Sequence, residues 1–207
     1  MDPAPHHVHG YWRRHAAALF RWLHIYLSMV SFAILFFFAV TGITLNHASW
    51  FDQNALRTTS FKGKVQQEWL GASGPYTVDK LQIVEHLRNV HGIRGALGDF
   101  TVDDAQCMVS FRGPGYTADA SINRGTGEYE LTETRMGFVA IINDLHKGRD
   151  TGAAWSWVID LSAVLMIVVS LTGTVLIFFL KRRRFTGLVA AVLGGLVSYL
   201  AYRLWVP

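Results

Sequence analysis

The histidines are the residues of this 207-residue chain that most clearly indicate chemistry, and there are nine of them. Three lie beside long apolar segments: His24 and His47 at the two ends of residues 25–47, and His146 shortly before residues 153–181. A neutral imidazole nitrogen is a good metal ligand, and two of them from facing helices can hold a haem iron inside a helical bundle. These three histidines are therefore the candidate haem ligands.

His47 and His146 form the favoured ligand pair, because they bracket residues 48–152 at matching ends of the two apolar segments. Folding of the region between them brings those ends together, so the sequence predicts haem b with His47 and His146 bound to its iron. Aromatic side chains are available as walls at Phe36–Phe38 and Trp155. A simpler reading also stays open, in which each histidine only hydrogen-bonds to headgroups or water at the membrane interface.

His24 needs a separate explanation, since 23 residues of helix place it about 34 Å from His47. It either ligates a second haem, with the other ligand supplied by another chain, or it is an ordinary interfacial residue. Two Thr-Gly pairs, Thr41-Gly42 and Thr172-Gly173, lie within the apolar segments. The missing side chain of each glycine is expected to leave room for a flat macrocycle.

The remaining reactive residue types indicate weaker sites. The N-terminal stretch contains His6, His7 and His9, which would bind metal loosely, as in a metal-handling accessory protein. Asp160 lies inside an apolar segment, where a carboxylate is costly and is therefore a functional candidate. The single cysteine, Cys107, excludes an internal disulfide. The sequence has no zinc-ligand spacing, phosphate-binding loop, dinucleotide-binding loop or nucleophile motif, so no catalytic residue is assigned.

The composition indicates which elements position these histidines. The chain is 51% hydrophobic and 16% charged, whereas soluble proteins carry about 25% charged residues. Long uncharged runs predict three transmembrane helices at residues 25–47, 153–181 and 188–207, with a tail at 1–24 and a basic loop at 182–187. The basic residues gather beside these runs rather than on a soluble face, so nucleic-acid binding is not expected.

The distribution of positive charge predicts the orientation in the membrane. Basic residues flank the first two apolar segments on one side: Arg13, Arg14 and Arg21 before the first, and residues 181–184 after the second. The positive-inside rule then places the N-terminus in the cytoplasm and residues 48–152 outside it, and no cleavable signal peptide is expected. Small residues recur along the third segment at Gly187, Ala191 and Gly195. This stripe favours packing against the other spans over assembly of a homo-oligomer.

Residues 48–152 have the pattern of a small α+β domain. Helical spacing predicts a helix over 77–91, capped by Thr77 and followed by Gly92. Its apolar face is expected to comprise Leu81, Val84, Leu87 and His91. Alternation with a period of two predicts strands in AQCMVSFRG, YTADASIN and EYELTE, with a Gly- and Asn-rich turn at 123–127. Cys107 falls on the apolar face of the first of these strands and is interpreted as a core residue.

Two segments of the chain resemble the helices of the PepSY-associated transmembrane (PepSY_TM-like) proteins. They are WLHIYLSMVSFAILFFFAVTGITLNH at 22–47 and LHKGRDTGAAWSWVIDLSAVLMIVVSLTGTVLIFFLKRRR at 145–184. The helix and strands between them, with the turn NRGTGEY, are similar to a PepSY domain. The resemblance implies a bacterial inner-membrane protein with a periplasmic PepSY domain, related to haem-containing ferri-siderophore reductases. It also implies His24, His47 and His146 as haem ligands, although this chain has three spans where larger members have more.

These features together predict a b-type haem protein of the inner membrane. It would transfer electrons from quinol or a redox partner protein to a periplasmic acceptor, either ferric iron or a ferri-siderophore, as an oxidoreductase. The alternative is a non-enzymatic protein whose spans in the lipid bilayer only anchor a PepSY module for binding or assembly.

Overall fold

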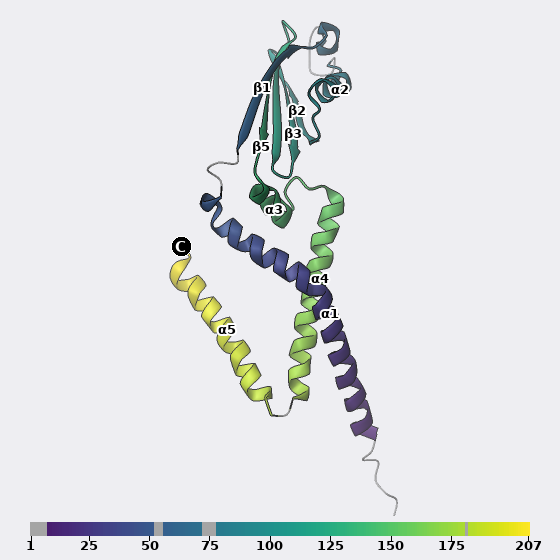
Figure 1. Cartoon of the computed structure of the whole chain (residues 1–207), viewed down its shortest axis with the longest axis vertical. Helices are drawn as coiled ribbons and strands as arrows, with labels where there is room; N and C mark the ends of the chain where they lie inside the picture. Colours follow the sequence, from purple (N-terminus) through teal and green to yellow (C-terminus); the bar gives the residue numbers. More distant parts are fainter. Residues whose placement is uncertain (1–7, 52–55, 72–77, 181) are drawn as a thin grey trace, which may run out of the picture. The chain divides into compact units, whose positions relative to one another are not determined.

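The computed structural model describes residues 8–51, 56–71, 78–180 and 182–207, with side chains from residue 11 onward. The chain divides into two compact units, one of residues 1–36 with 160–207 and one of residues 37–159. Two long helices, α1 (Val8–Asn46) and α4 (Ala153–Phe179), contribute residues to both units (Figure 1). His6, His7 and the side chain of His9 lie outside the described residues, so the loose metal site predicted there stays a prediction.

Three helices are long and apolar enough to cross a bilayer. They are Tyr11–Asn46 within α1, the whole of α4, and α5 (Arg184–Trp205), with mean hydropathies of 2.2, 2.5 and 1.7. Their apolar side chains are mostly exposed in the protein alone, as expected for helices that face lipid. The expectation of a membrane protein with α-helical spans is confirmed.

Helix α1 begins much earlier than the predicted span. It is already helical at Val8, so most of the stretch expected as a tail at 1–24 continues the helix. The alanines, leucines and arginines of this stretch are strong helix formers, which explains why the helix does not stop at the edge of the apolar run. At 39 residues, α1 is about 58 Å long. This exceeds the ~30 Å hydrocarbon core of a bilayer.

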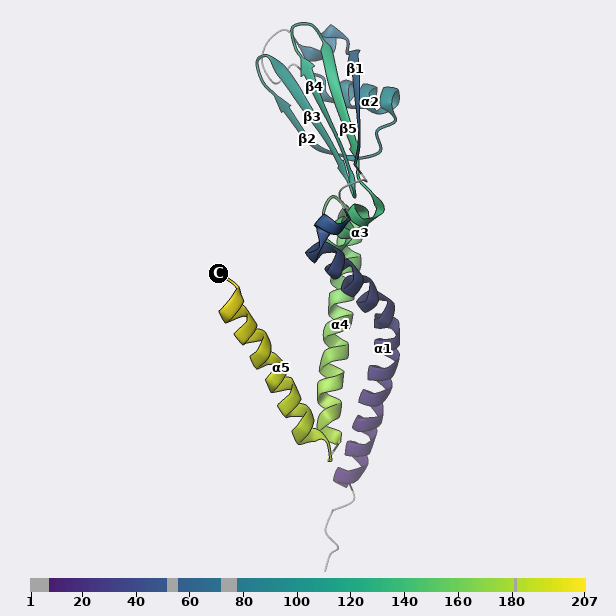
Figure 2. The ribbon, with the colours of Figure 1, turned by 60° about the vertical axis from the view of Figure 1, so that its left-hand side comes forward.

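A five-stranded antiparallel sheet forms most of the second unit (Figure 2). Its strand order is β1-β5-β4-β3-β2, and the helix α2 (Lys80–His91) covers one of its faces. The strands are β1 (Arg57–Lys64), β2 (Ala96–Val102), β3 (Gln106–Gly113), β4 (Tyr116–Asn123) and β5 (Glu128–Arg135). The predicted α+β unit is therefore confirmed, together with its three predicted strands.

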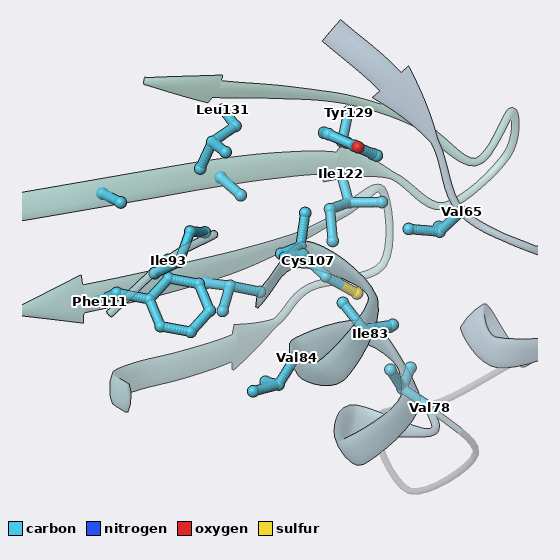
Figure 3. Close-up of a cluster of buried hydrophobic side chains, with 14 of the residues drawn as sticks. Val65, Val78, Ile83, Val84, Ile93, Cys107, Phe111, Ile122, Tyr129 and Leu131 are labelled. Carbon is cyan, nitrogen blue, oxygen red and sulfur yellow. The ribbon is translucent and has the colours of Figure 1, made fainter. Parts of the chain in front are cut away.

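The core lies between α2 and the sheet (Figure 3). Alternate residues of β3 point into it, and Cys107, Val109 and Phe111 are each at most 1% exposed. The opposite face of the same strand is open, with Met108 50% exposed. The interpretation of Cys107 as a core residue is confirmed, and burial raises the pKa of its thiol.

The buried face of α2 differs in part from the predicted one. Its buried residues are Ile83, Val84 and Leu87, whereas Leu81 is 67% exposed. The helix starts at Lys80 and is capped by Asp79, whose carboxylate accepts a hydrogen bond from Gln82 N–H. Thr77, the predicted cap, lies outside the described residues. Ile83 therefore takes the place on the buried face that was predicted for Leu81. Gly92 ends the helix in the left-handed conformation, as expected.

The turn between β4 and β5 matches its prediction in detail. Asn123 Oδ1 accepts hydrogen bonds from the backbone N–H groups of Gly125 and Thr126, at 2.9 and 3.1 Å. Gly127 adopts a φ of +73°, which few residues with a side chain tolerate. The strands β1 and β2, the helix α3 (Phe138–Lys147) and two 3-10 helices, Ala48–Trp50 and Gln67–Leu70, had no counterpart in the prediction.

Candidate functional site

His146 lies in the last turn of α3, against a wall formed by α1. Its Nδ1 is 2.6 Å from Thr41 Oγ1, and its ring meets the ring of Phe38 edge to face at 5.0 Å. A Cβ placed on Gly42 would lie 3.9 Å from His146 Cε1. One face of α1 therefore supplies an aromatic ring, a hydroxyl and a gap without a side chain to a single imidazole.

Helix α3 is fixed on both sides of His146. Asn143 Oδ1 accepts a hydrogen bond from the Thr44 hydroxyl at 2.6 Å. Asp144, which is 4% exposed, accepts from Gly115 N–H at 2.8 Å and pairs with Arg149. The Leu145 carbonyl accepts from the Trp155 indole N–H at 2.8 Å. Three consecutive residues before His146 thus tie its backbone to α1, to the sheet and to α4.

The hydrogen bonds around His146 favour a proton on its Nδ1. The Thr41 hydroxyl donates its single proton to the Phe37 carbonyl at 2.7 Å, so toward His146 it acts as an acceptor. With Nδ1 as the protonated nitrogen, which this arrangement favours, the lone pair of a neutral ring lies on Nε2. Among the hydrogen bonds of the described residues, none involves this Nε2. Metal-ligating histidines commonly have this arrangement, in which the ring nitrogen that does not bind the metal donates its N–H to an acceptor.

His24 has the same arrangement in the other unit, between α1 and α4. Its Nδ1 lies 3.1 Å from the Val169 carbonyl oxygen and 3.1 Å from Thr172 Oγ1. A carbonyl can only accept, so Nδ1 carries the proton and the lone pair again lies on Nε2. The Thr172 hydroxyl donates to the same Val169 carbonyl at 2.9 Å, which leaves its oxygen free to accept from His24. Within the described part of the chain, His24 Nε2 has no hydrogen-bond partner.

Each of the two Thr-Gly pairs therefore contacts one imidazole ring, and each pair is called an imidazole seat below. Thr41-Gly42 receives His146, and Thr172-Gly173 receives His24, with Nδ1 on the threonine and Cε1 over the glycine in both cases. A Cβ on Gly173 would lie only 3.0 Å from His24 Cε1. The edge of the His24 ring fills the gap at Gly173, whereas the gap at Gly42 still has room for a methyl group, so the expected slot for a macrocycle stays a prediction there.

His47 lies just beyond the C-terminal end of α1, in a different environment. Its ring stacks on the ring of Trp50 at 3.9 Å and 11°. Its Nε2 lies 3.4 Å from Asn46 Nδ2, a long contact in which the amide is the donor. No hydrogen bond or ring contact among the described residues joins His47 to His146. The pairing of these two histidines on one iron stays a prediction.

The other candidates lie apart from these seats. Asp160 is exposed on α4, and no described cation pairs with it. On α2, His91 Nε2 is 2.7 Å from Tyr129 Oη, and burial together with the neighbouring His86 lowers the pKa of His91. Both α2 histidines, His86 and His91, are half-buried against aromatic rings.

A family model described as PepSY_TM-like matches residues 18–207. The chain belongs to the PepSY_TM-like family. The match includes α1 from residue 18 onward, the other two membrane helices and the whole antiparallel sheet, so the protein is a membrane α-helical protein with a PepSY-like domain. No curated protein and no solved structure matches the chain.

Membership of the PepSY_TM-like family places both imidazole seats inside the matched region. The two threonines are the site residues that sequence reasoning missed, since Thr41 and Thr172 were noted only for the glycines that follow them. A signal was available in the sequence. Each threonine precedes a glycine within an apolar helix, where a hydroxyl needs a hydrogen-bond partner and the adjacent gap admits a ring.

Proposed function

We propose that this PepSY_TM-like protein is a b-type haem protein of the bacterial inner membrane, which passes electrons to an acceptor in the periplasm. The acceptor is ferric iron or a ferri-siderophore, and the donor is quinol or a redox partner protein. The observation that carries the proposal is the state of His146 and His24. Both rings are anchored through Nδ1 and present the Nε2 lone pair, which is the nitrogen that a haem iron binds.

The residues that would hold the haem are His146 and His47 at one seat, with His24 as the candidate ligand of a second haem. For His146 the donor chemistry fits, because its half-buried ring is held at Nδ1 by Thr41 and packs against Phe38, and no described residue bonds to Nε2. His47 would have to leave Trp50, and a stacked aromatic pair contributes only about 1 kcal/mol. When bound, the haem supplies one-electron transfer, while the protein orients its iron and shields it from water.

The orientation of the protein is part of the same proposal. The arginines of the first unit that flank the spans, Arg13, Arg14, Arg21 and Arg182–Arg184, favour the cytoplasmic side. The PepSY-like domain would then lie in the periplasm, where it can meet the acceptor. Protease treatment of intact spheroplasts should cleave the domain, whereas cleavage only after lysis would place the domain in the cytoplasm and contradict this orientation.

An absorption spectrum of the purified protein tests the haem directly. Protein from haem-replete cells should show a Soret band, and its visible bands should split when dithionite is added. The His146→Ala variant should lose that signal, while His86→Ala, a change on the α2 surface, should keep it. Colourless parent protein, or a His146→Ala spectrum identical to that of the parent, would remove the proposal.

A second function is favoured by the open face of the sheet. The face opposite α2 carries a polar groove of about 650 Å³, whose lining includes Ser110, Arg112, Asp119 and Glu130. Such a face suits a non-enzymatic module that binds or assembles another protein, with the spans acting as an anchor. The discriminating result would be a colourless protein in which His24→Ala, His47→Ala and His146→Ala all behave like the parent.

A further inference from the structure

A basic cavity lies in the first unit, at the end of α4 and beside the first turns of α1. It has a volume of about 820 Å³, within the size range of ligand pockets. Five guanidinium groups line it: Arg13, Arg14, Arg21, Arg182 and Arg183. No residue of the two imidazole seats lines this cavity, so ligand binding here does not depend on haem.

The local structure explains why the arginines converge. On α1, Arg13 and Arg21 are separated by eight residues, about 12 Å, and Ala17 between them lines the same cavity. The small side chain of Ala17 leaves the space open. On the other side, the N–H groups of Arg183 and Arg184 both bond to the Leu180 carbonyl at 3.0 Å. This tight turn after α4 holds Arg183 at the cavity.

The described residues supply no carboxylate to balance this cluster. Residues 1–36 and 160–207 contain eight Lys or Arg residues but only two acidic ones, Asp2 and Asp160. Asp160 lies twenty residues before Leu180, which is about 30 Å away along α4. Within the described ranges, none of the five guanidinium groups forms an ion pair with a carboxylate. The unbalanced charge of the described residues favours an anion bound from outside the chain.

The rest of the lining indicates what kind of anion fits. Leu176, Phe179 and Leu180 give the cavity an apolar wall, and the Phe179 ring also packs near Phe20 at 6.4 Å. One guanidinium group can bind two phosphate oxygens through parallel N–H···O hydrogen bonds. An apolar wall binds hydrocarbon. We propose that the cavity binds an anionic phospholipid, with its phosphate among the arginines and the start of its acyl chains along the wall of α4.

Native mass spectrometry of the full-length protein in neutral detergent tests this inference. Phosphatidylglycerol titrated into the sample should give bound adducts at lower lipid concentration than phosphatidylcholine. Removing two guanidinium charges with Arg14→Gln/Arg183→Gln should weaken phosphatidylglycerol binding about 25-fold, at roughly fivefold per arginine. The matched control is Arg94→Gln/Arg203→Gln, which removes the same charge away from the cavity and should change the affinity less than twofold.

Three outcomes would overturn the inference. Equal binding of the two lipids would show that the phosphate charge is not recognised. Equal loss in the control variant would show that only net charge matters. Binding of inorganic pyrophosphate, lost in the double variant, without any preference for phosphatidylglycerol, would assign the cavity to a soluble phosphate ligand instead. Far-UV circular dichroism of each variant in the same detergent establishes that the helices are intact.

Discussion

Gly42 and Gly173 provide a matched pair of perturbations at the two imidazole seats. In an alanine variant, the new methyl group at Gly42 would lie 3.9 Å from His146 Cε1, an ordinary van der Waals distance. At Gly173 it would lie 3.0 Å from His24 Cε1, so that ring must move by a few tenths of an ångström. The same substitution therefore tests how tightly each threonine holds its histidine.

The expected free energies follow from three contributions. Replacing glycine by alanine inside a helix favours the folded state by about 1 kcal/mol, so Gly42→Ala should be neutral or stabilising. At Gly173 the displaced ring weakens the Nδ1 contacts to Val169 and Thr172, each hydrogen bond contributing about 1 kcal/mol. Overpacking adds a further cost of about 1–3 kcal/mol. Gly173→Ala should therefore be destabilised by about 1–3 kcal/mol.

Thermal unfolding in a neutral detergent, followed by circular dichroism at a helical wavelength, measures the difference. Gly194→Ala is the control, because a Cβ at this position on α5 meets nothing within 4 Å and changes only helix propensity. Gly42→Ala and Gly194→Ala should melt together, and Gly173→Ala several degrees lower. If Gly173→Ala melts with the other two, the tight seat of His24 is refuted.

Three further outcomes follow from the second unit. Asp144→Asn should destabilise the protein by about 1–3 kcal/mol in a thermal melt, because the substitution removes a buried carboxylate and with it the ion pair to Arg149. Cys107 should react with a thiol reagent at pH 8 only after denaturation, since it is buried and its thiol pKa is raised; rapid reaction of folded protein would contradict its core position. Folding lowers the pKa of His91, so the neutral His91 ring stabilises the folded state fully above about pH 6.5, the pKa of the unfolded chain. This stabilisation is lost as the pH falls through the lower pKa of the folded state. His91→Gln should flatten that part of the melting-temperature profile, and an unchanged profile would assign the pH dependence to another group.

The sequence was sufficient for strands that have one covered face. In β3, Cys107, Val109 and Phe111 alternate with exposed residues because α2 buries only one side of the sheet. The edge strand β1 gives no such signal, since its first four residues are all exposed and it is held by pairing with β5. Its partner is more than sixty residues away, and no local pattern encodes a contact at that distance.

The candidate site was predictable in its residue types but not in its contacts. Helix α3 is only ten residues long, and over so short a segment helical spacing is hard to recognise, so no helix was predicted there. Without that helix, His146 was placed only by its distance along the chain from the span. The structure turns it toward Thr41, which lies six residues, or about 9 Å, before His47 on α1. Side-chain direction depends on this docking, which residue spacing alone does not determine.

The anchoring of His24 and His146 is compatible with two roles, and Nε2 distinguishes them. As a structural link between helices, each ring needs only Nδ1, and its second nitrogen has no protein hydrogen-bond partner among the described residues. Asparagine or glutamine in place of histidine could preserve the bond to the threonine without presenting that lone pair. Replacing His24 or His146 by asparagine or glutamine therefore separates the two roles, because a packing contact would be kept while ligation through Nε2 would be lost.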